Sequence, residues 1–177
     1  MSFCGRRFNL YLLPVALCLL ASGCALWHHK EKQVAVLRIH VENESSAAGS
    51  NKAISVLRSE PVTLNIFTDP ILTEADVIGA RVLDTPGGFA LEVKFEDIAG
   101  WKLEQYSASN PGKHLAIFAQ WSDKVADGRW LAAPLMVRRI ADSKLVFTPD
   151  ASREEMEKLV KGLNLAAKKN ADQKSKQ

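Results

Sequence analysis

Apolar and polar residues alternate along several short stretches of the chain, and this alternation predicts β-strands. The first stretch has Leu37, Ile39 and Val41 at every second position, with polar residues between them. Because successive side chains of a strand point to opposite faces, such a stretch predicts a strand with one buried face. A Pro-Gly-Gly turn between two of the stretches predicts a hairpin. The predicted strands cover residues 33–43, 53–58, 62–67, 80–84, 89–95, 114–121, part of 131–140, and 145–147.

Two other stretches have the spacing of amphipathic helices. Residues 97–110 carry apolar side chains at helical intervals, and a Pro-Gly pair then ends the pattern. We expect Trp101 to lie on the buried stripe of this helix. Residues 153–163 form the second helix, with an apolar stripe on one side. A short helix is also expected at Thr73, since Asp76 follows three residues later as in a capping box.

These elements together predict an α+β fold, with an antiparallel β-sheet and about two main helices packed on one face. The fold is expected to occupy residues 34–165, which is enough for one domain of ordinary size. Residues 44–51 are rich in Ser, Ala and Gly and predict a loop. Residues 166–177 are polar and rich in lysine, so we expect a disordered tail there.

The first 23 residues have the composition of an export signal. Two arginines, Arg6 and Arg7, precede an uninterrupted apolar run at residues 10–20, and small residues follow. Spanning a bilayer needs roughly 20 apolar residues, so this run is about half the length of a membrane-spanning helix. The sequence therefore favours a signal peptide over a transmembrane anchor.

Residues 20–24, Leu-Ala-Ser-Gly-Cys, resemble the lipobox of bacterial lipoproteins. The resemblance implies cleavage between Gly23 and Cys24 and attachment of lipid, including palmitate-like acyl chains, to Cys24. The alternative is an ordinary secretory signal with a chance cysteine. Each buried CH₂ contributes about 0.8 kcal/mol, and two or more chains anchor a protein stably. We therefore predict a protein of the cell envelope, held to a membrane by Cys24, with residues 24–33 as a tether and the body facing the periplasm or another extracytoplasmic space.

Net charge and cysteine content reduce the number of possible functions and structural features. Loss of the signal peptide lowers the formal net charge from +3 to +1, and the tail at residues 166–177 carries +3, so residues 24–165 carry −2. A nearly neutral body gives no basis for binding nucleic acid. Apart from Cys24, the mature chain has no cysteine and can form no internal disulfide.

No motif for catalysis, for a cofactor or for a metal stands out in the sequence. The adjacent His28 and His29 are interpreted as solvated residues of the tether, because neighbouring residues do not face one ligand position. His40 is expected to be solvated on the polar face of its strand. His114 begins a strand and is expected to have a surface or capping role.

Two tryptophans are less easily assigned to the core. Trp121 and Trp130 bracket the polar residues 122–129 and form a candidate binding surface, since aromatic residues often anchor interfaces. The alternative, which we favour, is that both lie at the end of a hairpin.

The order of several short motifs between residues 61 and 163 resembles the first periplasmic head subdomain of SecD, the membrane subunit that assists the Sec translocase. In this family an acidic helix start is followed by a strand that ends in Phe, an Asn-x-Gly-Arg-x-Leu-Ala-Ile run, an Ala-Pro pair before an apolar strand, and Phe-Thr before an acidic helix. The matching residues are Thr73, Ala75, Asp76, Val77 and Ala80, and residues 91–95, 110–117, 133–137, 147–148 and 154–155.

The chain departs from the family's pattern at two turns and in its membrane helices. Residues 120–130 replace the family's Asp-Gly hairpin, and residues 141–144 replace its Gly-Gly turn. Membrane helices of the SecD type are not among the predicted elements, and a protein without them has no route for coupling a proton gradient to movement. The resemblance therefore implies a SecD head-like fold and the handling of exported polypeptides, but neither the translocase motor nor any catalytic residue.

Three functions remain open at this point. The leading hypothesis is a non-enzymatic, lipid-anchored binding domain that assists protein export, with the membrane and exported polypeptides or envelope proteins as partners and with no cofactor. The second is an envelope enzyme, for which Asp69, Asp76 and His114 are the candidate residues. The third is a structural link between membrane and cell wall through the lysine-rich tail, which could meet an anionic polymer.

Overall fold

Strand β1 (Val36–Val41) lies inside a four-stranded antiparallel sheet and is the first element of the computed structural model. The structure describes residues 35–43 and 51–175, all of them within the unit Lys32–Gln177. The predicted signal peptide, Cys24 and the tether lie outside the described residues, as do residues 44–50 of the predicted loop and the last two residues of the tail.

The four-stranded sheet has the order β4-β1-β7-β8. Strand β1 pairs along its whole length with β7 (Leu115–Gln120), from Val36 opposite Gln120 to Val41 opposite Leu115. The nearly continuous apolar sequence of β7 fits this central position, because the strand is covered on both faces. The edges are the two-residue β4 (Leu72–Thr73) and β8 (Gly128–Ala132).

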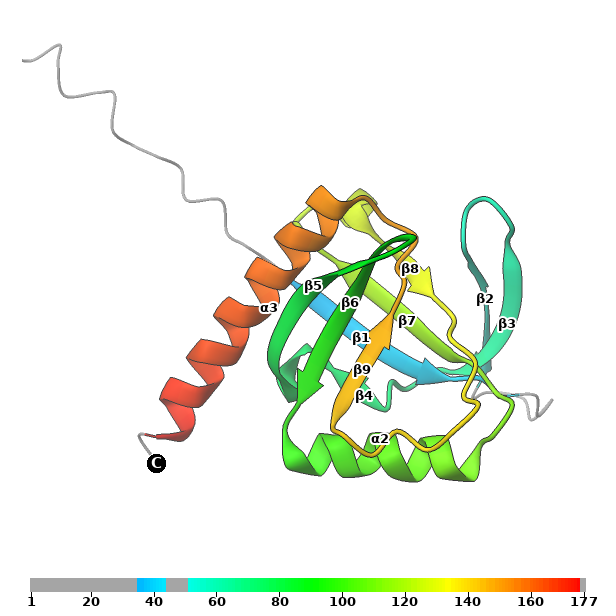
Figure 1. Ribbon diagram of the computed structural model, residues 1–177, viewed down its shortest axis with the longest axis horizontal. Helices are drawn as coiled ribbons and strands as arrows, with labels where there is room; N and C mark the ends of the chain where they lie inside the picture. Colours follow the sequence, from blue (N-terminus) through cyan, green and yellow to red (C-terminus); the bar gives the residue numbers. More distant parts are fainter. Residues whose placement is uncertain (1–34, 44–50, 176–177) are drawn as a thin grey trace, which may run out of the picture. The chain divides into compact units, whose positions relative to one another are not determined.

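A three-stranded antiparallel sheet faces the first sheet and has the order β5-β6-β9 (Figure 1). Strands β5 (Val77–Thr85) and β6 (Gly88–Phe95) form the predicted hairpin, and β9 (Lys144–Phe147) pairs with the other side of β6. Gly88 has φ of 139°, a conformation that favours glycine and permits the tight turn.

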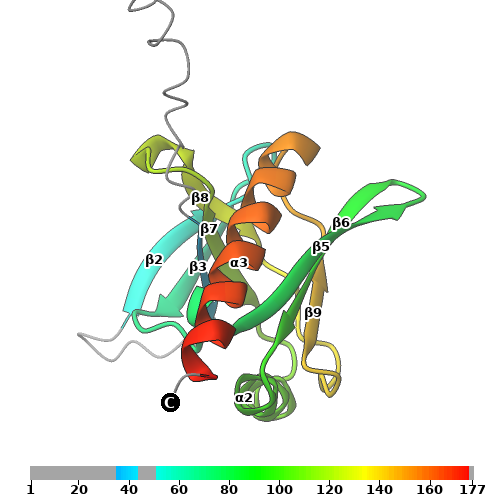
Figure 2. The same ribbon diagram turned by 90° about the vertical axis from the view of Figure 1, so that its left-hand side faces the viewer.

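The strands β2 (Asn51–Val56) and β3 (Val62–Phe67) form a separate two-stranded hairpin. Figure 2 shows this hairpin on one side of β7 and β8, with the three-stranded sheet and both helices on the other side. A small apolar cluster joins the hairpin to the four-stranded sheet and includes Ala116 of β7, with Trp130 of β8 packed against it. The four-stranded sheet is therefore covered on its inner face and, where the hairpin packs, on part of its outer face.

The main core fills the space between the two larger sheets. Helices α2 (Asp97–Ser109) and α3 (Arg153–Lys174) close two sides of this space, so both lie on the same side of the four-stranded sheet (Figure 1). The core residues include Leu37, Ile39, Val41, Leu91, Val93, Phe95, Leu103, Leu115, Ile117, Leu131, Met156, Leu159 and Leu163.

The predicted α+β class, with antiparallel strands and two main helices, is confirmed, although the strands are divided among three sheets. The capping box at Thr73 is also confirmed: its side chain accepts a hydrogen bond from Ala75, and Asp76 accepts one from the backbone of Thr73. The helix that follows is a single 3-10 turn, η1 (Glu74–Asp76). A second such turn, η2 (Val125–Asp127), precedes β8.

The predicted disordered tail is wrong for residues 166–174, because α3 continues through them as far as Lys174. Ala, Lys and Gln dominate this stretch and favour helix, so the polar composition does not end the helix where the apolar stripe ends. Lys174 lies in the last turn, where a cation is favourable, and its Nζ is 2.5 Å from Glu96 Oε2.

The expectation that Trp101 is a core residue is wrong. Its side chain is 79% exposed, and Ile98 one turn earlier is 73% exposed. The buried face of α2 consists instead of Leu103 and three small residues, Ala99, Gly100 and Ser107. These small residues allow the helix to pack closely on residues 140–143, where the backbone N–H of Ile140 donates to Ser107 Oγ at 2.9 Å.

Gly100 marks the closest approach between α2 and that segment. A Cβ placed on Gly100 would lie 2.5 Å from Ser143 Cβ and 3.1 Å from Ser143 Cα, and the latter belongs to backbone. We predict that Gly100→Ala lowers the free energy of unfolding by about 1–3 kcal/mol, as overpacking does. Chemical denaturation measures this loss. Gly87→Ala is the control, because a Cβ there meets nothing within 4 Å, and an equal loss in both variants would contradict the prediction.

Candidate functional site

His40 is buried and has a structural role. The hairpin β2–β3 covers the polar face of β1, so His40 is only 7% exposed, and the prediction that it is solvated is wrong. Its Nδ1 lies 2.9 Å from the carbonyl oxygen of Phe67, and its ring meets that of Trp130 edge-on at 5.4 Å. Burial lowers the pKa of His40, and the hydrogen bond to Phe67 only partly offsets this effect.

The three candidate catalytic residues, Asp69, Asp76 and His114, each make different contacts. Glu42 Oε2 lies 2.7 Å from His114 Nδ1 and accepts a hydrogen bond from the backbone N–H of His114 at 2.9 Å. Asp76 completes the capping box of η1, and Asp69 is exposed on the surface. The hydrogen bonds and ion pairs of the described residues join none of these three to another.

Trp121 is 6% exposed and belongs to the main core, so the candidate binding surface is wrong for this residue. The guanidinium of Arg129 lies over its ring, 4.8 Å from the centroid. Trp130 is half-buried and packs edge-on against Phe118 at 5.5 Å. Trp130 is paired with Phe118 in the β7–β8 hairpin, and Trp121 directly follows β7. Trp121 belongs to the main core, and Trp130 packs against the smaller apolar cluster.

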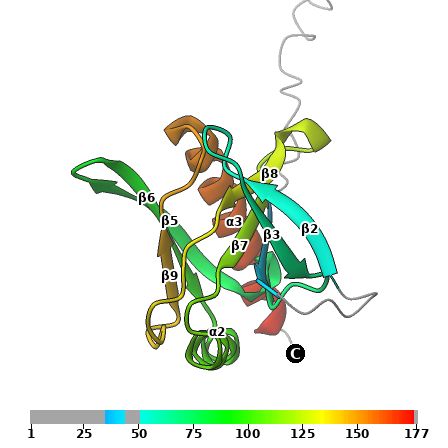
Figure 3. The same cartoon turned by 90° about the vertical axis from the view of Figure 1, so that its right-hand side faces the viewer.

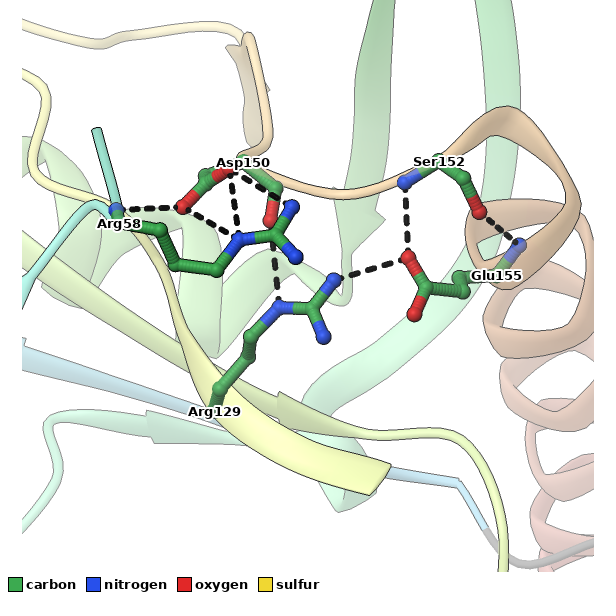
Figure 4. Close-up of polar contacts among 5 residues, drawn as sticks. All are labelled: Arg58, Arg129, Asp150, Ser152 and Glu155. Carbon is green, nitrogen blue, oxygen red and sulfur yellow. Dashed lines mark hydrogen bonds and ion pairs between the residues drawn. The ribbon is translucent and has the colours of Figure 1, made fainter. Parts of the chain in front are cut away.

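A polar cluster ties the hairpin β2–β3 to the start of α3 (Figure 4). Arg58 follows β2 and donates to the Asp150 carboxylate from its backbone N–H at 2.8 Å and from its guanidinium at 3.0–3.2 Å. Arg129 of β8 donates to the carbonyl oxygen of Asp150 and to the carboxylate of Glu155. Ser152 and Glu155 form the capping box of α3. Each of the five residues is hydrogen-bonded to another member of the cluster, so we interpret the cluster as structural.

The hydrogen bonds from the Arg58 side chain lower the pKa of Asp150, and the bond from the Arg58 backbone acts in the same direction. Burial raises the pKa of Glu155, but hydrogen bonds from Ser152 and Arg129 outweigh burial and leave the pKa below its ordinary value. Both carboxylates are thus held in their charged form by the contacts that join the hairpin to α3.

Exposed apolar side chains gather on α2, and we call Ile98 and Trp101 the α2 patch. Together with Lys102, Gln105 and Ala108 they line a shallow hollow that extends to Arg139. Arg139 Nη1 is 3.3 Å from Glu104 Oε1, which holds the arginine beside the helix. Two large apolar residues are thus exposed on adjacent turns of this helix face.

A larger hollow of about 640 Å³ lies between β9 and residues 134–142, and we call it the β9 groove. In Figure 3 this segment, in yellow, runs from β8 past β9 to α2. Buried Leu115, Met136 and Leu145 line the groove, and exposed Val137 and Val146 stand beside them. Arg139 lines both this hollow and the hollow at the α2 patch, so the two adjoin at this residue.

Neither the α2 patch nor the β9 groove was predicted from the sequence. The sequence of α2 carries the large residues Ile98 and Trp101 on one face and small residues on another. The small residues were the sign that the second face is the buried one. The signal for the groove was the apolar run at residues 135–137, which reads as a buried strand although only Met136 is buried. The described residues contain no group of His, Cys, Asp and Glu arranged to hold a metal ion.

No protein-family model matches the chain, and no curated protein matches its sequence. Among solved structures, it is similar to the crystal structure of SecDF in the super-membrane-facing form, with a TM-score of 0.54 and 22% identity over 75% of this chain and 19% of that chain. It is also similar to a structure of SecDF described as a membrane component that enhances protein export, with a TM-score of 0.54 and 21% identity over 93% of this chain and 71% of that chain.

These similarities confirm the predicted SecD-like fold, and at such low identity they show the fold alone. The chain spans about a fifth of the length of the first SecDF chain. In the part of the chain that the structure describes, neither helix is both long and apolar enough to cross a bilayer.

The Arg58–Asp150 contact generates a prediction about pH. Because the pKa of Asp150 in the folded protein lies below its ordinary value of 3.8, its stabilising effect is present above that value and is lost as the pH falls through the folded pKa. We predict that Asp150→Asn lowers the free energy of unfolding by about 1 kcal/mol at neutral pH. The difference from the unsubstituted protein should shrink in acid, as measured by denaturation at several pH values.

The control for this experiment is Asp123→Asn, which changes an exposed aspartate outside the cluster. It should leave the stability nearly unchanged at every pH. A loss for Asp150→Asn that persists undiminished in acid would contradict the role given to the charged carboxylate.

Proposed function

We propose that this protein is a lipid-anchored, non-enzymatic component of the cell envelope that binds extended segments of exported polypeptides and so assists protein export. The observation that carries this proposal is the surface formed by the β9 groove and the α2 patch, on a domain with a SecD-like fold. The proposed localisation is the outer side of a membrane, with lipid on Cys24 as the anchor.

The chemistry of the surface suits an unfolded chain. Exported polypeptides expose apolar side chains before they fold, and burying such side chains stabilises a complex by roughly 25 cal/mol per Å². Val137 is 76% exposed beside the groove, and Trp101 is exposed on the neighbouring helix. A tryptophan gives a large, rigid contact area that tolerates different partners.

The proposal that the protein is not an enzyme is supported by the surroundings of the candidate residues. Asp76 and His114 are both engaged in contacts that stabilise local structure, and His40 is buried beneath the hairpin. In contrast, the apolar side chains of the α2 patch have no such structural role in the described residues, so binding is the use that this surface supports best.

The anchor would keep the binding surface close to the membrane from which exported chains emerge. The tether at residues 24–33 reaches roughly 30 Å when fully extended. Capture of a segment by a domain on so short a tether would occur at a high effective concentration of emerging chains.

We predict that the full-length protein in detergent binds reduced, carboxymethylated α-lactalbumin, which is permanently unfolded, and does not bind the native folded form of that protein. Ile98→Ala combined with Trp101→Ala should weaken binding about tenfold, because both large side chains are lost from the surface. Fluorescence anisotropy measures the affinity. Leu165→Ala, which removes an exposed apolar side chain from α3, is the matched control. Equal binding of folded and unfolded probe, or no binding, would refute the proposed function.

The proposed anchor has its own test. Cys24→Ser should prevent lipid attachment and move the protein from the membrane fraction to the soluble envelope fraction of cells. Incorporation of labelled palmitate and the mass of the mature N-terminus measure the modification directly. Unlabelled protein that stays in the membrane fraction after this substitution would show another mode of attachment.

A further inference from the structure

The three-stranded sheet has two outer edges, and α3 closes one of them. Asn164 of α3 lies beside Ala80 of β5, where its side-chain oxygen accepts from the backbone N–H at 2.8 Å and its side-chain nitrogen donates to the carbonyl oxygen at 3.0 Å. The amide of Asn164 thus makes the two hydrogen bonds that a neighbouring strand would make. This edge cannot accept a further strand at Ala80.

The other edge, along β9, is open. Phe95 N–H donates to the carbonyl oxygen of Ser143 at 2.9 Å, which fixes which residues of β9 face β6. Hydrogen bonds alternate along an antiparallel pair, so Leu145 and Phe147 bond to β6 while the backbone groups of Lys144 and Val146 point away from it. The same alternation makes Ala80 point away from β6, as its contact with Asn164 requires.

Nothing in the described part of the chain hydrogen-bonds to the outward backbone groups of Lys144 and Val146. The nearby segment at residues 134–140 is bonded elsewhere, since Met136 exchanges backbone hydrogen bonds with Gly112 and Lys113. The β9 groove therefore combines an apolar floor with an unpaired strand edge. Unpaired donors and acceptors along a strand are matched best by another extended backbone.

We propose that an extended segment of another polypeptide binds in the β9 groove as a fourth strand, paired with β9. This inference rests on the proposed function and deepens it by naming the mode of binding. Side chains of paired residues share a face of the sheet. The segment residue opposite Leu145 therefore faces the core and should be apolar. The residues opposite Lys144 and Val146 lie on the other face of the sheet, so the two kinds of position alternate along the segment.

Charge selects among segments that have this alternation. Lys144 and Arg138 line the groove, and neither has an ion-pair partner among the described residues. Glu92 is held by Arg81 at 2.8 Å, and Arg139 is held by Glu104. Asp142 also lines the groove, so among the described residues the two unpaired cations Lys144 and Arg138 exceed the unpaired acid by one positive charge. An acidic residue opposite Lys144 forms a favourable cross-strand pair, whereas a lysine there is repelled. The preferred segment alternates apolar and acidic residues.

The test uses the full-length protein in detergent and a fluorescent peptide of about nine residues that alternates Val and Glu, a common strand length. Three matched peptides accompany it: one with Lys in place of Glu, one scrambled to destroy the alternation, and one with N-methyl groups on alternate backbone nitrogens. The N-methyl peptide keeps every side chain but cannot pair as a strand. We expect the Val-Glu peptide to bind about tenfold or more tightly than each of the other three.

Val146→Pro tests the same edge from the side of the protein. Proline is tolerated on an edge strand where the N–H faces outward, so the fold should persist, as the thermal midpoint will show. The substitution removes the outward N–H and should weaken binding of the Val-Glu peptide about tenfold or more. Val146→Thr keeps the N–H and a branched side chain and should leave the affinity within about twofold. Hydrogen exchange at the Val146 amide should slow when the peptide is added.

Several outcomes would overturn the inference. If the N-methyl peptide binds as well as the Val-Glu peptide, or if the Val146→Pro variant binds the Val-Glu peptide with unchanged affinity, no strand is added to β9. If the protein alone forms dimers that Val146→Pro abolishes, a second copy occupies the edge instead. If unfolded α-lactalbumin binds while the peptide tests fail, the proposed function stands and only the strand-addition mode is refuted. If unfolded α-lactalbumin does not bind, the proposed function itself is refuted.

Discussion

Strand β1 is buried along its inner face and, at His40, on its outer face as well, and the arrangement of the whole domain depends on this constraint. Leu37, Ile39 and Val41 face the main core, while His40 lies under the hairpin β2–β3. A strand covered on both faces needs a layer on each side, and the chain supplies the three-stranded sheet on one side and the hairpin on the other. The layers are joined at a second point by the contact of Arg58 with Asp150, which connects the hairpin to the loop before α3.

The sequence predicted the positions of most strands because their alternation is strong and local. Strand β3 has the predicted bounds, and the hairpin of β5 and β6 turns at the predicted Pro-Gly-Gly. Alternation does not reveal whether a distant hairpin covers the polar face of a strand, and this is why His40 was expected in solvent. The division of the strands into three sheets depends on the same long-range contacts, which no local pattern contains.

Helix faces were predicted less well, for a related reason. Large apolar residues normally mark the buried stripe of a helix, but α2 buries Gly100 and Ser107 so that its backbone can approach residues 140–143. Trp101 then has no room inside and remains outside. The groove next to β9 was beyond prediction from side chains, because its main property is a row of unpaired backbone groups, and that row follows from strand order. Helix α3 continues beyond the end of its apolar stripe because the residues that follow also favour helix.

The amide of Asn164 has a consequence for how copies of this protein can associate. Open strand edges on both sides of a sheet allow endless edge-to-edge stacking, which is the route to fibrous aggregates. With one side occupied by α3, the three-stranded sheet keeps a single attachment point. Two copies that met there would form an isologous pair with a two-fold axis, and that pair would leave no edge for a third. Helix α3, bonded to β5 through Asn164, thus limits growth through this sheet to a closed unit.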